Sequence, residues 1–356
     1  MQKMFVVLSD GHIFEGKGFG AVGETLGELV FTTGMVGYIE TLTDPSYYGQ
    51  IVMHTFPLIG NYGMISDDME SSTSVVKGYV VREWCEAPSN FRSESDIDTF
   101  LKEHNIVAVC GVDTREITKI IRENGVMNAV LTSDPSKVDK KALADYVIKD
   151  AVKSVSTHEK TVYKAENEKY RVALLDYGAK MNIIAELQKR DCTVCVYPYN
   201  TTAEEILAAD VDGIMLSNGP GDPAENTEAI AELKKLFGKK PIFGICLGHQ
   251  LLALAAGGKT EKLKYGHRGA NQPVKRIEDG RVFVTSQNHG YAVIGSSIDE
   301  KIGKVSFINA NDGTCEGVEY PEHKAFTVQF HPEACAGPID TKFLFDKFVS
   351  MLGGNK

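Results

Sequence analysis

The 356 residues are enough for about two domains, and a hydrophobic content of 43% allows two packed cores. The 38 Lys and Arg against 48 Asp and Glu give a net charge of 38 − 48 = −10, without a dense basic cluster, which argues against nucleic acid as a partner. No apolar run approaches the ~20 residues of a membrane span, and the N-terminus lacks the apolar core of a signal peptide. Seven cysteines, an odd number, favour a reducing cytoplasm over a disulfide framework.

The first 150 or so residues predict a β-rich domain. It begins with a hairpin of Met4 to Leu8 and His12 to Glu15, joined through a Ser-Asp-Gly turn. Asp113 caps a helix that ends at Gly125. The further elements predicted in this half are strands at Glu28 to Thr33, Ile51 to Thr55 and Val75 to Arg82, and helices after Ser95 and over Pro135 to Lys149.

Residues 153–170 are polar and charged without an apolar period, so we expect a linker between domains 1–152 and 171–356. From Arg171 onward, strand and helix patterns alternate, followed by shorter strands over 272–330 and a closing helix near 340–352. The fold class predicted is α/β: a doubly wound, mainly parallel C-terminal sheet with helices on both faces, preceded by a smaller β-rich α+β domain.

One cysteine stands where a buried strand turns into a helix. The apolar run Pro241 to Ile245 predicts the strand, and Leu247 to Ala256 predict the helix, with Cys246 between them and glycines on both sides. This is the arrangement of a nucleophile elbow, in which the helix N-terminus favours a thiolate. A lone cysteine at a strand end is more often a core residue, so the nucleophile interpretation depends on partners elsewhere.

Partners are found near the C-terminus. Residues 326–330 predict a strand that Pro332 ends, and His331 and Glu333, two apart, can point to the same side. His331 could take the proton of Cys246 and return it to a leaving amine, while Glu333 would orient the imidazole. A single His-x-Glu is more typical of a solvated strand end, but together with the elbow it indicates a catalytic triad.

A glycine-rich loop, Asn218-Gly219-Pro220-Gly221, follows the strand Gly213 to Leu216. Its backbone N–H groups can approach a ligand and, with that of Leu247, could form an oxyanion hole. For this loop alone, a plain strand-to-helix turn is an equally good interpretation.

Other motifs in the sequence are excluded by the strand patterns around them. Gly18 to Gly23 has the G-x-G-x-x-G spacing, but a strand pattern follows it instead of a helix. Cys192 and Cys195 have redox spacing within a strand pattern that turns the two sulfurs to opposite faces. No set of Cys and His has zinc-ligand spacing, so we expect no metal.

The three catalytic motifs resemble the class I glutamine amidotransferase domain, in the family's order over residues of roughly 171–353. Segment 286–291 (Ser-Gln-Asn-His-Gly-Tyr) and the N-terminal segments 37–47 and 57–63 resemble the carbamoyl-phosphate synthetase small subunit. Many relatives carry Gln at Ile39 and some carry Phe at Tyr291. The resemblance covers nearly the whole chain.

The resemblance implies Cys246, His331 and Glu333 as the triad of a glutaminase that works through a γ-glutamyl thioester. It also implies a set of glutamine contacts: Ser46, Gly219, Gly221, Leu247, Gln250, Asn288, Gly290 and Tyr291. For Ser46, a turn serine is an equally good interpretation. The ammonia would pass to a large subunit that carries ATP and Mg and makes carbamoyl phosphate from bicarbonate, for arginine or pyrimidine synthesis; this chain itself would need no cofactor.

Two alternatives stay open. One is another amidotransferase or cysteine hydrolase on the same kind of sheet, against which the segment around Ser46 argues. The other is a non-catalytic binding subunit with a relic site, against which the intact set of Cys246, His331 and Glu333 argues.

Overall fold

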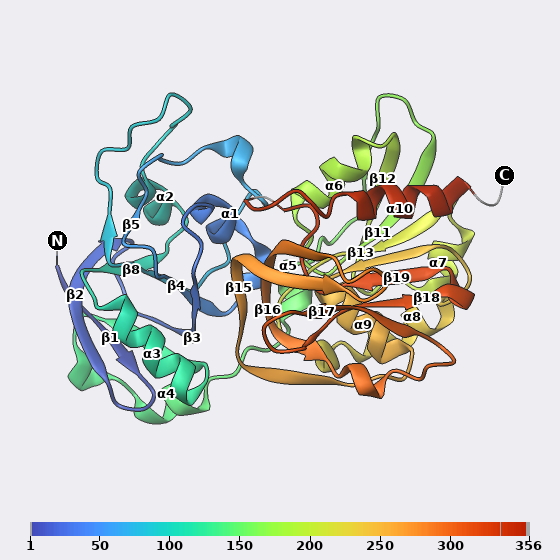
Figure 1. Cartoon of the computed structure of the whole chain (residues 1–356). Helices are drawn as coiled ribbons and strands as arrows, with labels where there is room; N and C mark the ends of the chain where they lie inside the picture. Colours follow the sequence, from blue (N-terminus) through green and yellow to red (C-terminus); the bar gives the residue numbers. More distant parts are fainter. Residues whose placement is uncertain (1, 335, 354–356) are drawn as a thin grey trace. The chain divides into compact units, whose positions relative to one another are not determined.

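The computed structural model describes residues 2–334 and 336–353. The chain divides into two compact units, Met1–Lys149 and Asp150–Lys356, whose elements are labelled in Figure 1. None of the helices within the described ranges is long and apolar enough to cross a membrane.

The first unit is built on a closed barrel with the strand order β1-β2-β8-β6-β4-β3-β9. Its strands are β1 (Lys3–Leu8), β2 (Ile13–Gly20), β3 (Thr25–Thr32), β4 (Gln50–His54), β5 (Leu58–Ile59), β6 (Gly78–Val80), β7 (Glu83–Trp84), β8 (Val107–Cys110) and β9 (Met127–Thr132). Its helices are α1 (Tyr38–Thr43), α2 (Ile97–Glu103), α3 (Thr114–Asn124) and α4 (Lys140–Asp145), with short 3-10 turns at Pro45–Tyr47, Ser66–Asp68 and Pro135–Lys137. The predicted N-terminal hairpin is confirmed, since β1 and β2 pair antiparallel.

Helix α3 shows how the sequence sets an element of this unit. The Asp113 side chain accepts a hydrogen bond from the Glu116 N–H at 3.0 Å and so caps the first turn. Ile117, Ile120 and Ile121 recur at helical spacing and are buried. The predicted start and end of this helix are therefore confirmed.

The second unit contains one large sheet with the order β10-β12-β11-β13-β14-β19-β18-β16-β15-β17. Its strands are β10 (Thr161–Tyr163), β11 (Tyr170–Asp176), β12 (Cys192–Pro198), β13 (Gly213–Leu216), β14 (Ile242–Ile245), β15 (Thr260–Arg276), β16 (Val282–Val293), β17 (Lys304–Asn309), β18 (Cys315–Tyr320) and β19 (Ala325–Val328). The central strands from β12 to β19 are mutually parallel, as the alternating elements predicted, while the strands at both ends of the sheet pair antiparallel.

Helices pack on both faces of this sheet. They are α5 (Ala151–Val155), α6 (Met181–Gln188), α7 (Ala203–Ala208), α8 (Thr227–Leu236), α9 (Leu247–Ala255) and α10 (Phe343–Leu352) (Figure 1). Alternate residues of β11 show the two faces: Val172 and Leu174 pack with α6 and α10, whereas Ala173 and Leu175 pack with α7, α8 and α9. The side chains of Cys192 and Cys195 likewise belong to the two different clusters, as their strand spacing predicted.

Two regions are more regular than their sequences suggest. Within residues 153–170, β10 pairs with β12 and so extends the sheet. Strands β15 and β16 form a long twisted pair where shorter strands were predicted. No element was predicted for the polar residues 260–271 of β15, but pairing with β16, interrupted by two register shifts, keeps the strand extended.

Candidate active site

Cys246 occupies a tight turn between β14 and α9. Its φ and ψ are 52° and −102°, a positive φ that is rare outside glycine and that marks backbone held in place by its surroundings. Gly248 permits the close approach, because an added Cβ there would lie 2.5 Å from the Leu216 carbonyl oxygen. The predicted elbow geometry is present, with the cysteine only 2% exposed.

The sulfur of Cys246 lies between two neighbouring segments. The thiol points toward the Asn288 carbonyl oxygen at 3.6 Å, and the Gln329 side-chain amide donates to the sulfur at 3.6 Å. Gln250 donates to the Gln329 amide oxygen at 2.9 Å and so fixes which end of that amide faces the sulfur. An N–H directed at sulfur stabilises a thiolate more than a thiol.

Gln329 is missing from the sequence-based set of site residues. The signal was available, because Gln329 and His331 are two apart in the predicted extended chain, just as His331 and Glu333 are.

His331 and Glu333 form a buried pair at the same edge of the sheet. Cys246 follows β14, His331 lies shortly after the adjacent strand β19, and the Cys246 N–H donates to the Val328 carbonyl at 2.9 Å. The His331 Nδ1 lies 2.7 Å from Glu333 Oε1, and both side chains are at most 1% exposed. A carboxylate at Nδ1 favours the tautomer with its proton there, which leaves the lone pair on Nε2. That Nε2 has no hydrogen-bond partner among the described residues.

Glu333 carries its negative charge although it is fully buried. Burial alone would raise its pKa, but the charge and hydrogen bond of His331, together with the Lys180 ammonium at 3.6 Å, lower the pKa below its usual value. The pair can therefore hold and stabilise an imidazolium. Sequence reasoning missed Lys180, which lies just before α6 and carries no motif of its own.

The glycine-rich loop lies against the start of α9. A Cβ added at Gly219 would collide with the Tyr177 carbonyl oxygen and would lie 2.8 Å from Leu247 Cδ2. The Ser217 carbonyl accepts the Gly248 N–H at 3.0 Å, which ties the loop to the elbow. Leu247 is the first residue of α9, a position whose N–H has no acceptor within the helix.

Segment 286–291 runs along β16 beside the elbow. Besides its bond to Gln329, Gln250 donates to the Tyr291 carbonyl at 2.7 Å, and Ser286 accepts the His331 N–H at 2.9 Å. Through these bonds and the Asn288 carbonyl, the segment contacts Cys246, helix α9 and His331. Gly290 lies within this segment on β16, while Gly221 lies on the loop after β13.

Ser46 is the one predicted glutamine contact in the first unit. It lies buried in the turn Pro45–Tyr47, where the Asp44 carboxylate accepts its N–H at 2.9 Å. Its role toward glutamine stays a prediction.

The chain is similar over its whole length to known proteins. It is 50% identical over 349 residues to the carbamoyl phosphate synthase small chain of Clostridium perfringens (strain 13 / Type A), which covers 98% of this chain and 99% of that protein. This chain belongs to the family of carbamoyl phosphate synthase small chains. Other small chains match comparably: that of Listeria monocytogenes serotype 4b is 50% identical over 359 residues, covering 100% of this chain and 98% of the relative. The small chain of Bacillus thuringiensis subsp. konkukian is 52% identical over 352 residues, which are 98% of this chain and 96% of the relative.

Both halves of the chain match a known family. Residues 6–131 match the carbamoyl-phosphate synthase small chain, CPSase domain, and residues 173–351 match glutamine amidotransferase class-I. The small-chain family therefore accounts for both units, and the amidotransferase match contains the elbow, the glycine-rich loop and the His331–Glu333 pair.

Proposed function

We propose that this chain is the glutaminase subunit of a carbamoyl-phosphate synthase, with Cys246, His331 and Glu333 as its catalytic triad. The observation that carries the proposal is the strained, buried Cys246 at a helix N-terminus, beside a strand that leads to a buried His331–Glu333 pair. Membership of the small-chain family supports glutamine as the substrate.

The reaction proceeds in two halves. His331 Nε2 takes the proton of Cys246, and the thiolate attacks the carbon of the glutamine side-chain amide. The oxyanion rests on the N–H groups of Leu247 and of Gly219 or Gly221. Collapse breaks the C–N bond, the leaving nitrogen takes the proton from His331, and ammonia departs. Water, deprotonated by His331, then hydrolyses the γ-glutamyl thioester to glutamate and returns the thiol.

The glutamine site combines several segments of the chain. Those around the elbow are brought together by the hydrogen bonds of Gln250 and the Asn288 carbonyl. The full set of proposed contacts is Ser46, Gly219, Gly221, Leu247, Gln250, Asn288, Gly290 and Tyr291.

We propose domains at residues 1–152 and 171–356, with 153–170 connecting them. For the second domain we propose the doubly wound, flavodoxin-like arrangement, which the parallel central strands with helices on both faces support. The first is the small-chain family's own N-terminal domain.

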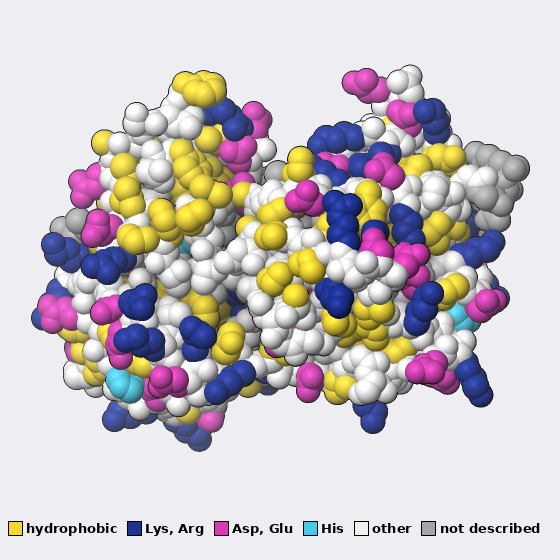
Figure 2. Space-filling view, in the orientation of Figure 1, with side chains coloured by type: hydrophobic (Ala, Val, Ile, Leu, Met, Phe, Trp, Pro, Cys, Tyr) yellow, Lys and Arg dark blue, Asp and Glu magenta, His cyan; other side chains and the backbone are white. Residues whose placement is uncertain are grey.

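The ammonia product requires a partner. Ammonia is largely protonated in neutral water and is then no nucleophile, which favours a sheltered route to a partner. Membership of the small-chain family supports a large subunit as that partner, and we expect ATP and Mg on it. We expect the first unit to supply much of the docking surface: Phe91 is 97% exposed and Met35 69% exposed, and Figure 2 shows hydrophobic side chains gathered over the upper part of this unit. We place the complex in the cytoplasm, where its carbamoyl phosphate serves arginine or pyrimidine synthesis.

The test is glutamate release from glutamine by the chain purified with its co-expressed large subunit, comparing wild type with Cys246→Ala. We expect the substitution to abolish glutamate release while the complex still makes carbamoyl phosphate from added ammonia. Equal glutamate release by both proteins would contradict the triad. No release by either, despite a formed complex, would favour a binding subunit with a relic site.

A further inference from the structure

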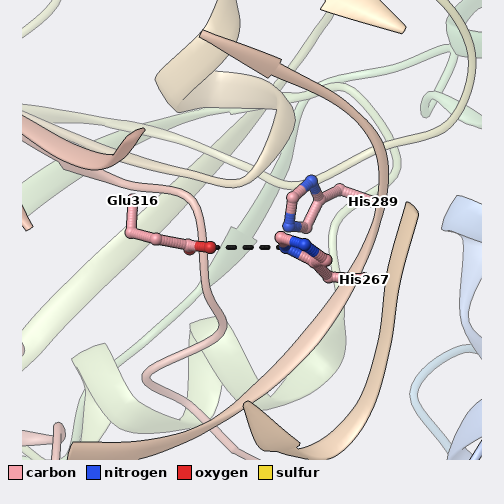
Figure 3. A group of neighbouring side chains, drawn as sticks. All are labelled: His267, His289 and Glu316. Atoms are coloured by element: carbon pink, nitrogen blue, oxygen red, sulfur yellow. Dashed lines mark ion pairs between the residues drawn. The ribbon is translucent and has the colours of Figure 1, made fainter. Parts of the chain in front are cut away.

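Three potential metal ligands outside the triad converge on neighbouring strands. His267 on β15, His289 on β16 and Glu316 on β18 place one ligand atom each within 4.8 Å of the others (Figure 3). His267 and His289 are paired across the two strands; His289 and Glu316 are more than nine-tenths buried, and the His267 side chain is 11% exposed. Because the residues come from three strands, no short sequence spacing reveals the group.

Each imidazole has one nitrogen on a second oxygen partner. His289 Nδ1 lies 2.7 Å from the Tyr291 carbonyl oxygen, which only accepts, so the proton is on Nδ1 and the lone pair on Nε2. His267 Nε2 lies 2.8 Å from the Asp312 carboxylate and its Nδ1 faces Glu316. Burial lowers the pKa of His267, but these two carboxylates outweigh it and raise the pKa, so a metal ion on Nδ1 would displace a proton.

The other nitrogen of each imidazole also faces an oxygen atom. His267 Nδ1 lies 3.5 Å from Glu316 Oε1, and His289 Nε2 lies 3.0 Å from Gln287 Oε1. The Gln287 amide cannot turn around, because its nitrogen donates to Glu316 Oε2 at 3.0 Å and to the Thr285 hydroxyl at 3.2 Å. At His289 two acceptors therefore face one another in a buried place, which is costly unless a positive charge lies beside them.

We propose that His267 Nδ1, His289 Nε2 and the Glu316 carboxylate bind one divalent metal ion of the zinc class. Two imidazoles and a carboxylate are ordinary zinc ligands, and bonds of about 2.1 Å in a tetrahedron put ligand atoms about 3.4 Å apart. The 3.5 Å between His267 and Glu316 already matches this spacing. Gln287 Oε1 or a water would take the fourth position.

The surroundings of the three ligands suit a metal. Each imidazole donates its other N–H to an oxygen, Asp312 for His267 and the Tyr291 carbonyl for His289, as metal-bound histidines usually do. The carboxylates of Glu316 and Asp312 balance the two positive charges of the ion. Asp312 is 46% exposed at its side chain, so the His267 edge gives the ion access from solvent.

The ion would hold the segment around His289 in place and would take no part in the reaction. His289 lies between Asn288 and Gly290, so a metal on His289 fixes the segment that supplies proposed glutamine contacts; this consequence rests on the proposed function. Loss of the metal should therefore raise KM for glutamine more than it lowers kcat. Metal binding can be tested without measuring glutamine hydrolysis.

The test is binding of Zn²⁺ and Co²⁺ to the chelator-treated complex of this chain with its large subunit, with the large subunit alone as a blank. We expect one tightly bound equivalent attributable to this chain, and a visible absorption spectrum of four-coordinate Co²⁺ with nitrogen and oxygen ligands. His267→Gln and Glu316→Gln should weaken binding at least ~100-fold. The exposed His158→Gln, as a matched control, should bind like wild type, and Cys246→Ser should too, which excludes the thiol as the ligand.

A wild-type complex that binds no stoichiometric metal would overturn the proposal, and this measurement needs no variant to fold. Metal binding unchanged in both His267→Gln and Glu316→Gln would also overturn it. Glutaminase activity takes no part in these readouts, so failure of the metal site and failure of the triad are separable.

Discussion

Replacing Glu333 by Gln isolates the charge in the His331–Glu333 pair, because the two side chains have nearly the same shape. In the wild type the buried carboxylate lies 2.7 Å from His331 Nδ1 and stabilises the imidazolium formed when Cys246 loses its proton. A hydrogen bond to a charged group contributes about 1.5–3 kcal/mol. At 1.36 kcal/mol per factor of ten, kcat for glutamine hydrolysis should fall about 10- to 150-fold. KM should change little, since the carboxylate faces His331 and not the substrate.

The assay is steady-state glutamate release by Glu333→Gln in the complex with its large subunit, with ammonia-dependent carbamoyl phosphate synthesis as a control for folding and assembly. The substitution also leaves Lys180 without its buried counter-charge, so a melting curve must show that the second unit is folded at the assay temperature. A folded variant with kcat within threefold of wild type would refute the role assigned to Glu333. A fall confined to kcat/KM through a raised KM would refute it as well.

Three further substitutions test other parts of the reasoning. Gln329→Leu removes the N–H directed at the Cys246 sulfur, so alkylation of the thiol by iodoacetamide should slow about tenfold, and an unchanged rate would contradict the contact. Gly219→Ala forces the loop away from the Tyr177 carbonyl, and loss of one oxyanion donor should lower kcat about 10²- to 10³-fold with little change in KM. Burial raises the pKa of Glu186, but hydrogen bonds from three Lys and Arg side chains at 2.8–2.9 Å outweigh it and lower the pKa to about 2. Because the folded pKa lies below the usual 4.5, the stabilisation from these ion pairs is complete above pH 4.5 and is lost as the pH falls toward 2. The difference between wild type and Glu186→Gln in urea unfolding should shrink over that range, and a constant difference would contradict the sign.

The elbow and the His331–Glu333 pair are predictable from sequence because their signals are local. A buried strand, a cysteine between glycines and an apolar helix determine the turn at Cys246 within about ten residues. His331 and Glu333 do lie together, but β19 ends at Val328 and Glu333 lies in a turn, so their closeness does not come from extended chain as predicted. The parallel core follows in the same way from alternating elements of ordinary length. Strands β15 and β16 escape this reasoning because their extended form depends on pairing with each other, which overrides the polar composition of β15.

Residues that act through tertiary contacts are not predictable from spacing. Lys180 reaches Glu333 from the start of another helix, and the group of His267, His289 and Glu316 forms only when β15, β16 and β18 come together. The sequence prediction of no metal depended on the short ligand spacings of zinc motifs, and a group assembled across a sheet has none, so that prediction stays to be tested. The convergence of two imidazoles and a carboxylate can be seen only in the fold. It leads to a measurable expectation, namely that this chain in its complex binds one zinc-class ion and loses it when His267 or Glu316 is replaced.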